Sequence, residues 1–293
     1  MTGKRTRLEA FQAYLYLSPS ALIFLAFTLL PAFYVLYIGL FNWNFLNTSM
    51  SKFVGFSNYT ALLKSPELWH SLIATFYFVL GSVPVGIFAA LFIALLLMRP
   101  FRGLGLVRLM FFAPYVTPVV STSIVWLWLF NPQFGLFNAI LHFLHLPQIG
   151  WVQSARWAMP SVILYTLWHT MGFNIIIFMA GLTTIPSELG EVARIDGASA
   201  WQEFWHVTWP LLTPTTLFVT VINTIGALQA FTQFFTLTNG GPAGSTTTAS
   251  FLLFQQAFVF YHTGYAAALA VLLFIIIAAL TLVQMRVSRS EAY

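Results

Sequence analysis

Residues Gly190 to Pro214 read GEVARIDGASAWQEFWHVTWPLLTP and lie between two long apolar runs. The stretch contains Glu191, Asp196 and Glu203, and Glu188 stands just ahead of it. Four of the seven acidic residues therefore fall in one short segment of a chain in which only 6% of the residues are charged. We expect this segment to make the contact through which the protein works.

A first helix and a turn are predicted at the start of this stretch. Ser187 can cap a helix whose first turn carries Glu188 and Glu191, where the positive end of the helix dipole favours them. Arg194 follows Glu191 by three residues, so the two are expected to pair and to steady the helix by about 0.2 to 0.5 kcal/mol. Gly197 can adopt the left-handed conformation that ends a helix, so the chain is expected to turn there.

A second short helix is predicted between this turn and Pro210, which opens the next apolar run. One face of this helix carries three aromatic side chains and a threonine, namely Trp201, Phe204, Trp205 and Thr208. His206 is interpreted as a passive interfacial residue. The stretch as a whole is expected to form a helix, turn, helix module across the ends of two membrane spans.

Composition places the chain among polytopic membrane proteins. Of its 293 residues 59% are hydrophobic and only 6% are charged, whereas a soluble domain would carry about 25% charged residues. Spans of about 20 residues and their loops leave room for six helices and for no large soluble domain. The chain has no cysteine, which excludes disulfides and thiolate ligands, and no basic face that would suit a nucleic acid.

The predicted fold is an all-α polytopic membrane protein that forms a single domain over residues 1–293. Six transmembrane helices are expected at about residues 14–41, 70–98, 109–130, 158–183, 211–237 and 258–285. Pro31 is expected to bend the first of them. The basic start before it suggests a signal peptide, but the apolar run is too long for one, so we expect a retained span.

Two connecting segments are predicted to lie on the outer surface. Residues 131–156 contain an apolar stripe typical of an interfacial helix, made by Phe134, Phe137, Ile140, Leu141 and Leu144. Residues 238–256 are rich in glycine, serine and threonine and are expected to form an irregular loop.

The distribution of lysine and arginine predicts the orientation. Nine of the twelve fall at the two termini, after the second span and in the Gly190 stretch, and only Lys52, Lys64 and Arg156 fall on the other side. Cytoplasmic loops carry the excess of positive charge. Both termini and the Glu191 loop are therefore expected in the cytoplasm, and the chain in the plasma or inner membrane.

The loop resembles the "EAA" loop of ABC importer permeases, which here spans residues 185–214 between the fourth and fifth spans. Ile185, Pro186 and Leu189 match the lead-in, and the matching loop residues are Glu191, Ala193, Asp196, Gly197, Ala198, Phe204, Pro210 and Pro214. Val192 departs from the pattern, where the family usually has its first alanine. Residues 114–138 and 238–265 resemble the carbohydrate-uptake branch that contains the maltose and glycerol-3-phosphate permeases. An ordinary amphipathic interfacial hairpin is the other interpretation of the loop.

The resemblance implies that the first short helix is a coupling helix seated in a separate ATP-binding subunit. Coupling is then expected to depend on Glu191, Ala193, Asp196, Gly197 and Ala198. The chain has no phosphate-binding loop of the G-x-x-x-x-G-K-[ST] type, so it holds no cofactor or metal and has no catalytic residue; ATP and Mg²⁺ belong to the partner. The other implied partners are a second permease, giving a heterodimer, a second copy of the ATP-binding subunit, and an extracytoplasmic solute-binding protein.

Neutral polar residues inside the spans are the candidates for the solute pathway. They are His169 and Asn174, with the aromatic Phe173 beside them, in the fourth span and Asn223, Gln229 and Gln233 in the fifth. Such groups suit sugars, whose hydroxyls need donors and acceptors and whose C–H faces stack on aromatic rings. For each polar residue, a hydrogen bond between helices is an equally good interpretation. Without a buried arginine, an oligosaccharide, a glycosyl-polyol compatible solute or a polyol fits better than a phosphate ester.

Two other classes of function, a secondary carrier and an intramembrane enzyme, fit the sequence less well than an importer. An ion-coupled secondary sugar carrier without an ATPase would need ionisable residues within its spans or inverted repeats, and neither is evident in the sequence. An intramembrane enzyme would need a cysteine, an H-E-x-x-H pair or two carboxylates at membrane depth. The ATP-driven importer therefore remains the main interpretation, with the carrier as its alternative.

Overall fold

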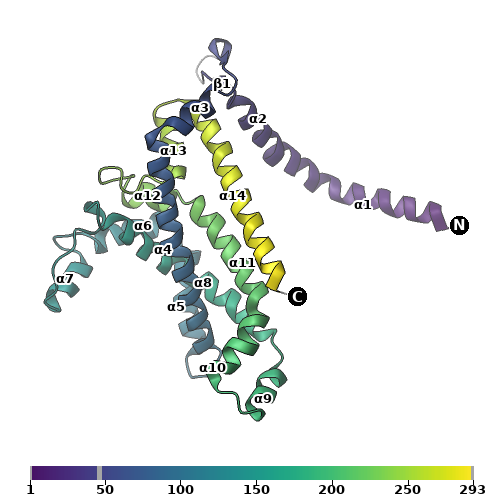
Figure 1. The fold of residues 1–293 in the computed structure, drawn as a ribbon, viewed down its shortest axis with the longest axis vertical. Coiled ribbons are helices and arrows are strands. Elements are labelled where there is room, and N and C mark those ends of the chain that lie inside the picture. Colours follow the sequence, from purple (N-terminus) through teal and green to yellow (C-terminus); the bar gives the residue numbers. More distant parts are fainter. Residues whose placement is uncertain (1, 45–47, 292–293) are drawn as a thin grey trace. The chain divides into compact units, whose positions relative to one another are not determined.

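The computed structural model describes residues 2–44 and 48–291, and these are almost entirely helical (Figure 1). The first part of the chain contains α1 (Thr2–Phe24), η1 (Leu25–Leu29), α2 (Leu30–Ile38), β1 (Phe41–Asn42), η2 (Thr48–Met50), β2 (Lys52–Phe53), α3 (Ser57–Lys64) and α4 (Pro66–Leu97). The middle part contains α5 (Leu104–Val116), α6 (Val119–Leu129), α7 (Leu136–Phe143), η3 (Trp151–Gln153) and α8 (Ala158–Thr183). The last part contains α9 (Ser187–Ile195), α10 (Ala200–Glu203), η4 (Phe204–Thr208), α11 (Trp209–Leu228), α12 (Thr232–Leu237), α13 (Ala249–Phe254), η5 (Gln255–Val259) and α14 (Thr263–Glu291).

Within the described residues, five helices are long and apolar enough to cross a membrane. They are Gln12–Ile38, Pro66–Leu97, Ala158–Thr183, Ala200–Leu228 and Thr263–Val287. A sixth span results if α5 and α6, which meet at a bend of 102°, are counted together. The predicted class of an all-α polytopic membrane protein is confirmed.

The chain divides into two compact units, and α14 contributes residues to both. The single domain over residues 1–293 stays a prediction. The first unit covers residues 1–65 and 253–274. It includes the antiparallel pair of β1 and β2, in which Phe41 lies opposite Phe53. In the same unit the Asn58 side-chain amide donates to the carbonyls of Gly39 and Phe41, at 2.9 Å each, and so ties α3 to the end of α2.

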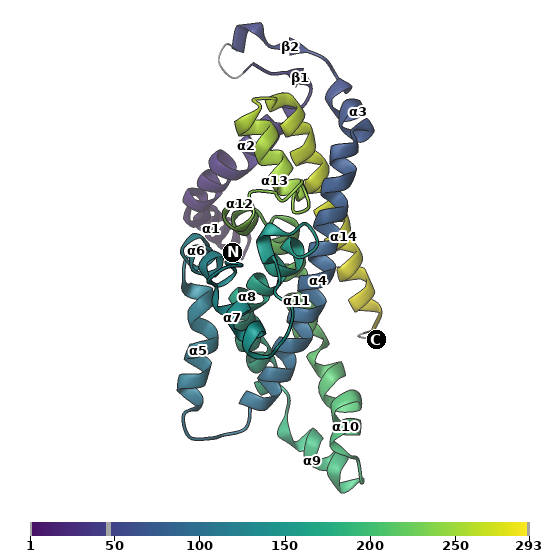
Figure 2. The same cartoon turned by 90° about the vertical axis from the view of Figure 1, so that its left-hand side faces the viewer.

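The second unit covers residues 66–252 and 275–293 and is built on α4, α8 and α11, which lie side by side (Figures 1 and 2). Large side chains fill the space between these helices and α12, with Phe78, Tyr165, Phe178 and Phe234 fully buried. Gly172 of α8 lies directly against the backbone of α5. The absence of a side chain at this glycine lets the two helices approach closely.

The third predicted span, a single helix over residues 109–130, is wrong in one respect: the chain breaks inside it. Thr117 and Pro118 are extended, with ψ angles of 137° and 132°, and separate α5 from α6. Proline has no backbone N–H, and it disfavours the helical conformation in the residue before it. The Thr117–Pro118 pair therefore stops α5, and the chain resumes as α6 in a new direction.

The fifth predicted helix, over residues 211–237, is displaced toward the N-terminus. Pro210 does not separate two helices, because α10, the π-helical segment η4 and α11 run continuously from Ala200 to Leu228. Proline cannot donate a backbone hydrogen bond, and the wider π-helical turn just before Pro210 accommodates this missing bond without ending the helix. At the other end the helix stops at Leu228, whose carbonyl accepts a hydrogen bond from Ser250 Oγ at 3.0 Å, and residues 232–237 form the separate helix α12.

The remaining helices differ less from the predicted ranges. The fourth span coincides with α8, and α4 begins four residues before residue 70. The segment 238–256 is not wholly irregular, because residues 249–259 form a short apolar helix, and α14 begins at Thr263 rather than at residue 258. In the first span a π-helical segment, η1, lies immediately before the turn that holds Pro31. The predicted interfacial helix within residues 131–156 corresponds to α7.

Candidate functional site

The helix α9 ends in a turn built by the backbone. After the C-cap Asp196, the N–H of Gly197 donates to Arg194 O at 3.1 Å and that of Ala198 to Ala193 O at 2.9 Å. This pair of hydrogen bonds is a Schellman motif, which requires a left-handed residue in the middle. Gly197 has φ +86°, so its predicted role in the turn is confirmed. The helix begins differently from the prediction, with Pro186 rather than Ser187 at the N-cap position.

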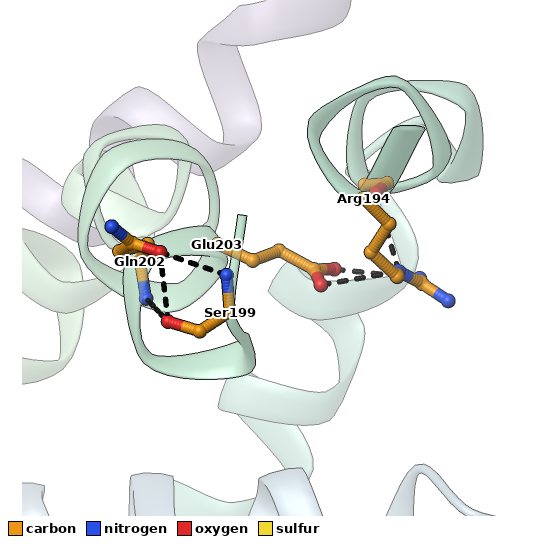
Figure 3. A network of polar contacts seen from close by, with 5 residues as sticks. Arg194, Ser199, Gln202 and Glu203 are labelled. Carbon is orange, nitrogen blue, oxygen red and sulfur yellow. Dashed lines mark hydrogen bonds and ion pairs between the residues drawn. The ribbon is translucent and has the colours of Figure 1, made fainter. Parts of the chain in front are cut away.

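The next helix, α10, starts with a reciprocal cap (Figure 3). Gln202 N donates to Ser199 Oγ at 3.4 Å, and Ser199 N donates to Gln202 Oε1 at 2.8 Å. Serine followed three residues later by glutamine is a capping box. The signal was present in the sequence as SAWQ and would have placed the helix start at Ala200.

An ion pair joins α9 to α10. Arg194 Nε lies 3.2 Å from Glu203 Oε2, and its Nη2 lies 3.4 Å from Oε1 (Figure 3). The expected pairing of Arg194 with Glu191 is therefore wrong, because the guanidinium turns across the loop toward α10. Gly190 is buried beneath this pair, and a Cβ there would lie 2.6 Å from Glu203 Oε1, so a larger residue would require the carboxylate to shift.

The side of α9 that faces away from the ion pair is both acidic and apolar. Glu191 and Asp196 are exposed. Leu189, Val192 and Ile195 are also exposed, and for Ile195 the exposed fraction reaches 84%. Ala193 and Ala198 are half-buried. Exposed apolar side chains that lie together on one helix mark a surface that another molecule covers.

A second feature of the same unit is a cavity of about 220 Å³ among α4, α5, α8, α11 and α12. Its lining contains no charged side chain and consists of Phe78, Ser82, Val83, Tyr115, Thr166, Thr170, Phe173, Ile222, Asn223, Gly226, Ala227 and Gln233. The rings of Tyr115 and Phe173 stack at 4.9 Å between centroids. The wall thus combines stacked aromatic rings with hydroxyl and amide groups.

The structure brings three of the six predicted pathway residues to this cavity: Phe173, Asn223 and Gln233. Asn174 lies behind the wall, where it exchanges hydrogen bonds with Asn223: Asn174 Nδ2 donates to Asn223 Oδ1 at 3.2 Å, and Asn223 Nδ2 to Asn174 Oδ1 at 2.8 Å. Gln229 is exposed at the C-terminal end of α11 and is not in the lining.

His169 lies at the break between α5 and α6 and not in the cavity wall. Its Nε2 is 3.2 Å from Thr117 O, to which it donates, since a carbonyl oxygen can only accept. One turn earlier on α8, Tyr165 Oη donates to Val119 O at 3.0 Å and lies 2.7 Å from Thr122 Oγ1. His169 thus bonds a carbonyl that the end of α5 leaves free, and Tyr165 binds the first turn of α6, so two side chains of α8 hold the chain on both sides of the break.

Tyr115 is a cavity residue that the sequence analysis missed. It lies two residues before Thr117 at the end of α5, so the break sets where its ring points. The only signal in the sequence was an aromatic residue next to the Thr-Pro pair. Among the described residues, no three histidine, aspartate or glutamate side chains gather where they could hold a metal ion.

Comparison with known proteins identifies the family. Residues 82–291 match the family described as "Binding-protein-dependent transport system inner membrane component". The chain belongs to this family. It is therefore a permease subunit of a transport system and lies in the inner membrane, and the predicted membership of the ABC importer permeases is confirmed.

The permease is similar over most of its length to several characterised relatives. It is 33% identical to the sulfoquinovosyl glycerol transport system permease protein SmoG of Agrobacterium fabrum, over 95% of this chain and 91% of the relative. It is 32% identical to the trehalose/maltose transport system permease protein MalF of Thermococcus litoralis, over 99% and 97%. It is 34% identical to the sn-glycerol-3-phosphate transport system permease protein UgpA of Agrobacterium fabrum, over 93% of both chains.

The fold of the permease is also that of solved transporters. A bacterial alginate ABC transporter, in complex with an alginate pentasaccharide-bound periplasmic protein, matches with a TM-score of 0.86 at 20% identity, over 100% of this chain and 99% of that one. A structure of a bacterial ABC transporter that imports alginate matches with a TM-score of 0.84 at the same identity. At this identity the likeness establishes the fold of the permease.

Proposed function

We propose that this permease moves a neutral carbohydrate-like solute across the inner membrane as part of an ABC importer. The solute is an oligosaccharide, a glycosyl-polyol compatible solute or a polyol. An extracytoplasmic solute-binding protein delivers it, a second permease completes the pathway, and two copies of an ATP-binding subunit supply the energy. ATP and Mg²⁺ are bound by that subunit and not by this chain.

The observation that carries this proposal is the composition of the cavity wall. A sugar presents hydroxyls, which need neutral donors and acceptors, and C–H faces, which pack on aromatic rings. The cavity offers Thr166, Thr170 and Gln233 for the first and the Tyr115–Phe173 stack for the second. No charged side chain lines it, so an anionic solute would lack the cationic partner that phosphates and carboxylates require.

The names of the relatives support a carbohydrate-like solute. They refer to sulfoquinovosyl glycerol, to trehalose and maltose, and to lactose. These are carbohydrates or glycosides; the first carries an anionic sulfonate, and the others are neutral. The relative named for sn-glycerol-3-phosphate shows that the family also takes phosphate esters, and the uncharged wall of this cavity argues against that choice here.

Coupling to ATP hydrolysis is assigned to α9. Its exposed apolar stripe, Leu189, Val192 and Ile195, suits insertion into a groove of an ATP-binding subunit, and Glu191 and Asp196 flank this stripe with negative charge. Ala193 and Ala198 keep the approach close. Because the turn between α9 and α10 is closed by the hydrogen bonds of Gly197 and Ala198 and by the Ser199 capping box, it can transmit a push without rearranging internally.

The orientation follows from the charges. Lysine and arginine concentrate at the termini, after α4 and in the α9 region, and this excess of positive charge supports a cytoplasmic position for these parts. The segment 131–156 and the loop from Asn239 to Pro242 then face outward and receive the binding protein. That loop is compact, since Thr246 Oγ1 lies 2.7 Å from Thr238 Oγ1 and donates to Gly241 O at 2.8 Å.

The test is the ATPase activity of the whole assembly in lipid, with each of a panel of neutral sugars, glycosides and polyols in turn. We expect stimulation by one neutral solute and none by a phosphorylated analogue. Gly197→Asp is expected to abolish stimulation while the protein stays in the membrane, because it adds a second negative charge beside Asp196 at the subunit contact.

Gly197→Asn is the matched control. Asparagine and aspartate both tolerate the left-handed backbone that φ +86° demands, so the two variants differ mainly in charge. The asparagine variant should therefore keep most of the stimulation. Normal uptake by Gly197→Asp would contradict the coupling role, and uptake that follows an imposed proton or sodium gradient without ATP would replace the importer by an ion-coupled carrier.

A further inference from the structure

A groove of about 490 Å³ lies at the end of α4, beside α10 and η4, and is separate from the solute cavity. One wall is a stripe of α4 at helical spacing, formed by Phe88, Leu91, Phe92 and Leu95. The other wall is a stripe of the continuous helix that begins at residue 200, formed by Ala200, Trp201, Phe204 and Thr208. Both walls are mainly apolar, and Phe88, Phe92 and Trp201 are exposed.

The groove has a cation at one end. Arg99 lines it two residues after α4 stops, in line with the stripe that carries Phe92 and Leu95. Within the described part of the chain, the Arg99 guanidinium has no hydrogen-bond or ion-pair partner. Glu203 also lines the groove, but its carboxylate is bound to Arg194 on the other side of α10.

Positive charge surrounds this end of the groove. Arg102 and Arg108 belong to the same connection between α4 and α5, and Arg108 Nη2 donates to Leu97 O at 3.2 Å. Neither of these two arginines lines the groove. The groove is apolar and has a tryptophan and an arginine where its apolar stripe ends. This arrangement suits a lipid at the bilayer interface, because the acyl chain can pack on the stripe and the headgroup can bind the arginine.

We propose that this groove binds one anionic phospholipid of the cytoplasmic leaflet. Its phosphate lies at Arg99 and at the indole N–H of Trp201, and one acyl chain lies along the α4 stripe against Phe204. Charge complementarity favours a lipid over other occupants. A phospholipid joins an anionic headgroup to a long apolar chain, and the groove has Arg99 at one end and the aromatic stripe along its length.

The groove lies next to the helix that holds α9, so a lipid bound there affects coupling. One wall is the start of the helix that begins with the Ser199 cap and carries Glu203, which holds α9 through Arg194. A lipid in the groove braces that helix against α4. The lipid therefore stiffens the mechanical link between the α9–α10 loop and the membrane spans.

The test measures lipid binding directly, without transport. The full-length permease, purified in its assembly and delipidated, is titrated with phosphatidylglycerol or with phosphatidylcholine of the same acyl chains and observed by native mass spectrometry. We expect one phosphatidylglycerol per permease, bound about fivefold more tightly than phosphatidylcholine, which is the preference that one arginine near a phosphate supplies. Arg99→Gln should remove this preference.

Arg102→Gln is the matched control, since it removes the same charge from the same connection but lies outside the groove. It should leave the binding of phosphatidylglycerol within about twofold of the unaltered permease, whereas Leu95→Trp, which fills the groove and keeps Arg99, should reduce it about fivefold. Each variant must elute as an intact assembly, so that a folding defect is not mistaken for lost binding.

Two results would overturn the proposal. Equal loss of phosphatidylglycerol in Arg99→Gln and Arg102→Gln would mean that the lipid responds only to the overall positive charge of the connection. Because the chain has no cysteine, Phe92→Cys can carry a single photo-crosslinker in the groove. If this variant captures the second permease or the ATP-binding subunit instead of lipid, the groove is a contact between subunits. Neither result would bear on the solute that the permease carries.

Discussion

The α9–α10 loop and the cavity that we propose for the solute belong to the same compact unit but are held together in opposite ways. The contacts that shape the loop join near neighbours: Gly197 bonds to Arg194, Ser199 to Gln202, and the ion pair between Arg194 and Glu203 spans nine residues. The contacts around the cavity join distant parts of the chain. Those of His169 with Thr117, Asn174 with Asn223 and Tyr165 with Val119 span 52, 49 and 46 residues.

Because of this difference, we expect substitutions in the two regions to have different effects. A substitution in the loop changes an exposed surface and a short-range turn, so it should impair coupling while the bundle stays folded. A substitution behind the cavity wall acts on several helices at once, so it should lower stability before it changes the solute.

The largest effect is expected at the crossing of α8 and α5. In Gly172→Ala the new methyl group would overlap the carbonyl of Phe111 and the backbone of Phe112, which are rigid parts of a helix. Overpacking of this kind costs about 1 to 3 kcal/mol or more. Thermal denaturation in detergent should show a lower midpoint and loss of the monodisperse peak.

Gly226→Ala is its control. Gly226 also lies inside a long helix, α11, but a Cβ there would meet no atom within 4 Å. This variant should be as stable as the unaltered permease or slightly more stable, since alanine favours a helix by about 1 kcal/mol over glycine. If Gly172→Ala were equally stable, the close packing of α8 on α5 would not be what holds the cavity wall.

A middle-sized effect is expected from the amide pair behind the cavity wall. Asn223→Leu alone leaves the buried Asn174 amide without its partner, at a cost of about 1 to 3 kcal/mol. Asn174→Leu should cost less, because Asn223 is half-buried at the cavity and its Nδ2 still donates to Val219 O at 2.8 Å. The double variant should cost less than the sum of the two, with a coupling energy of about 0.6 to 1.7 kcal/mol, the range for such pairs in membranes. Denaturation of all four proteins measures this, and strictly additive losses would refute the pairing.

The smallest effect is expected from the ion pair of the loop. The Arg194 side chain is 62% exposed, so Arg194→Gln or Glu203→Gln should lower stability by less than about 0.5 kcal/mol after screening by solvent. ATPase stimulation should fall by no more than about twofold, which corresponds to the same energy. The exchange Arg194→Glu with Glu203→Arg is the control. Complete loss of stimulation in either single variant, at unchanged stability, would place the pair in the subunit contact itself.

Much of the molecule could be predicted because its signals are local. Apolar runs of about the right length located the helices, and the range of α8 was predicted in full. The left-handed turn at Gly197 followed from one glycine after one helical pattern. The break at Pro118 had an equally local signal, a threonine before a proline, although the apolar run concealed it.

The sequence by itself determined the class of the protein, the place of its exposed loop and the conformation of the turn, because each depends on residues within a few positions of one another. Only the tertiary structure decided which polar residues face the cavity. His169, Asn174 and Gln229 are as polar as Asn223 and Gln233, which line the cavity, but they lie outside its wall. The rotation of α8 and the early end of α11 explain this difference. It also decided that Tyr115 reaches the cavity and that Arg194 binds Glu203, since both depend on how two helices meet, and no periodicity within one helix contains that information.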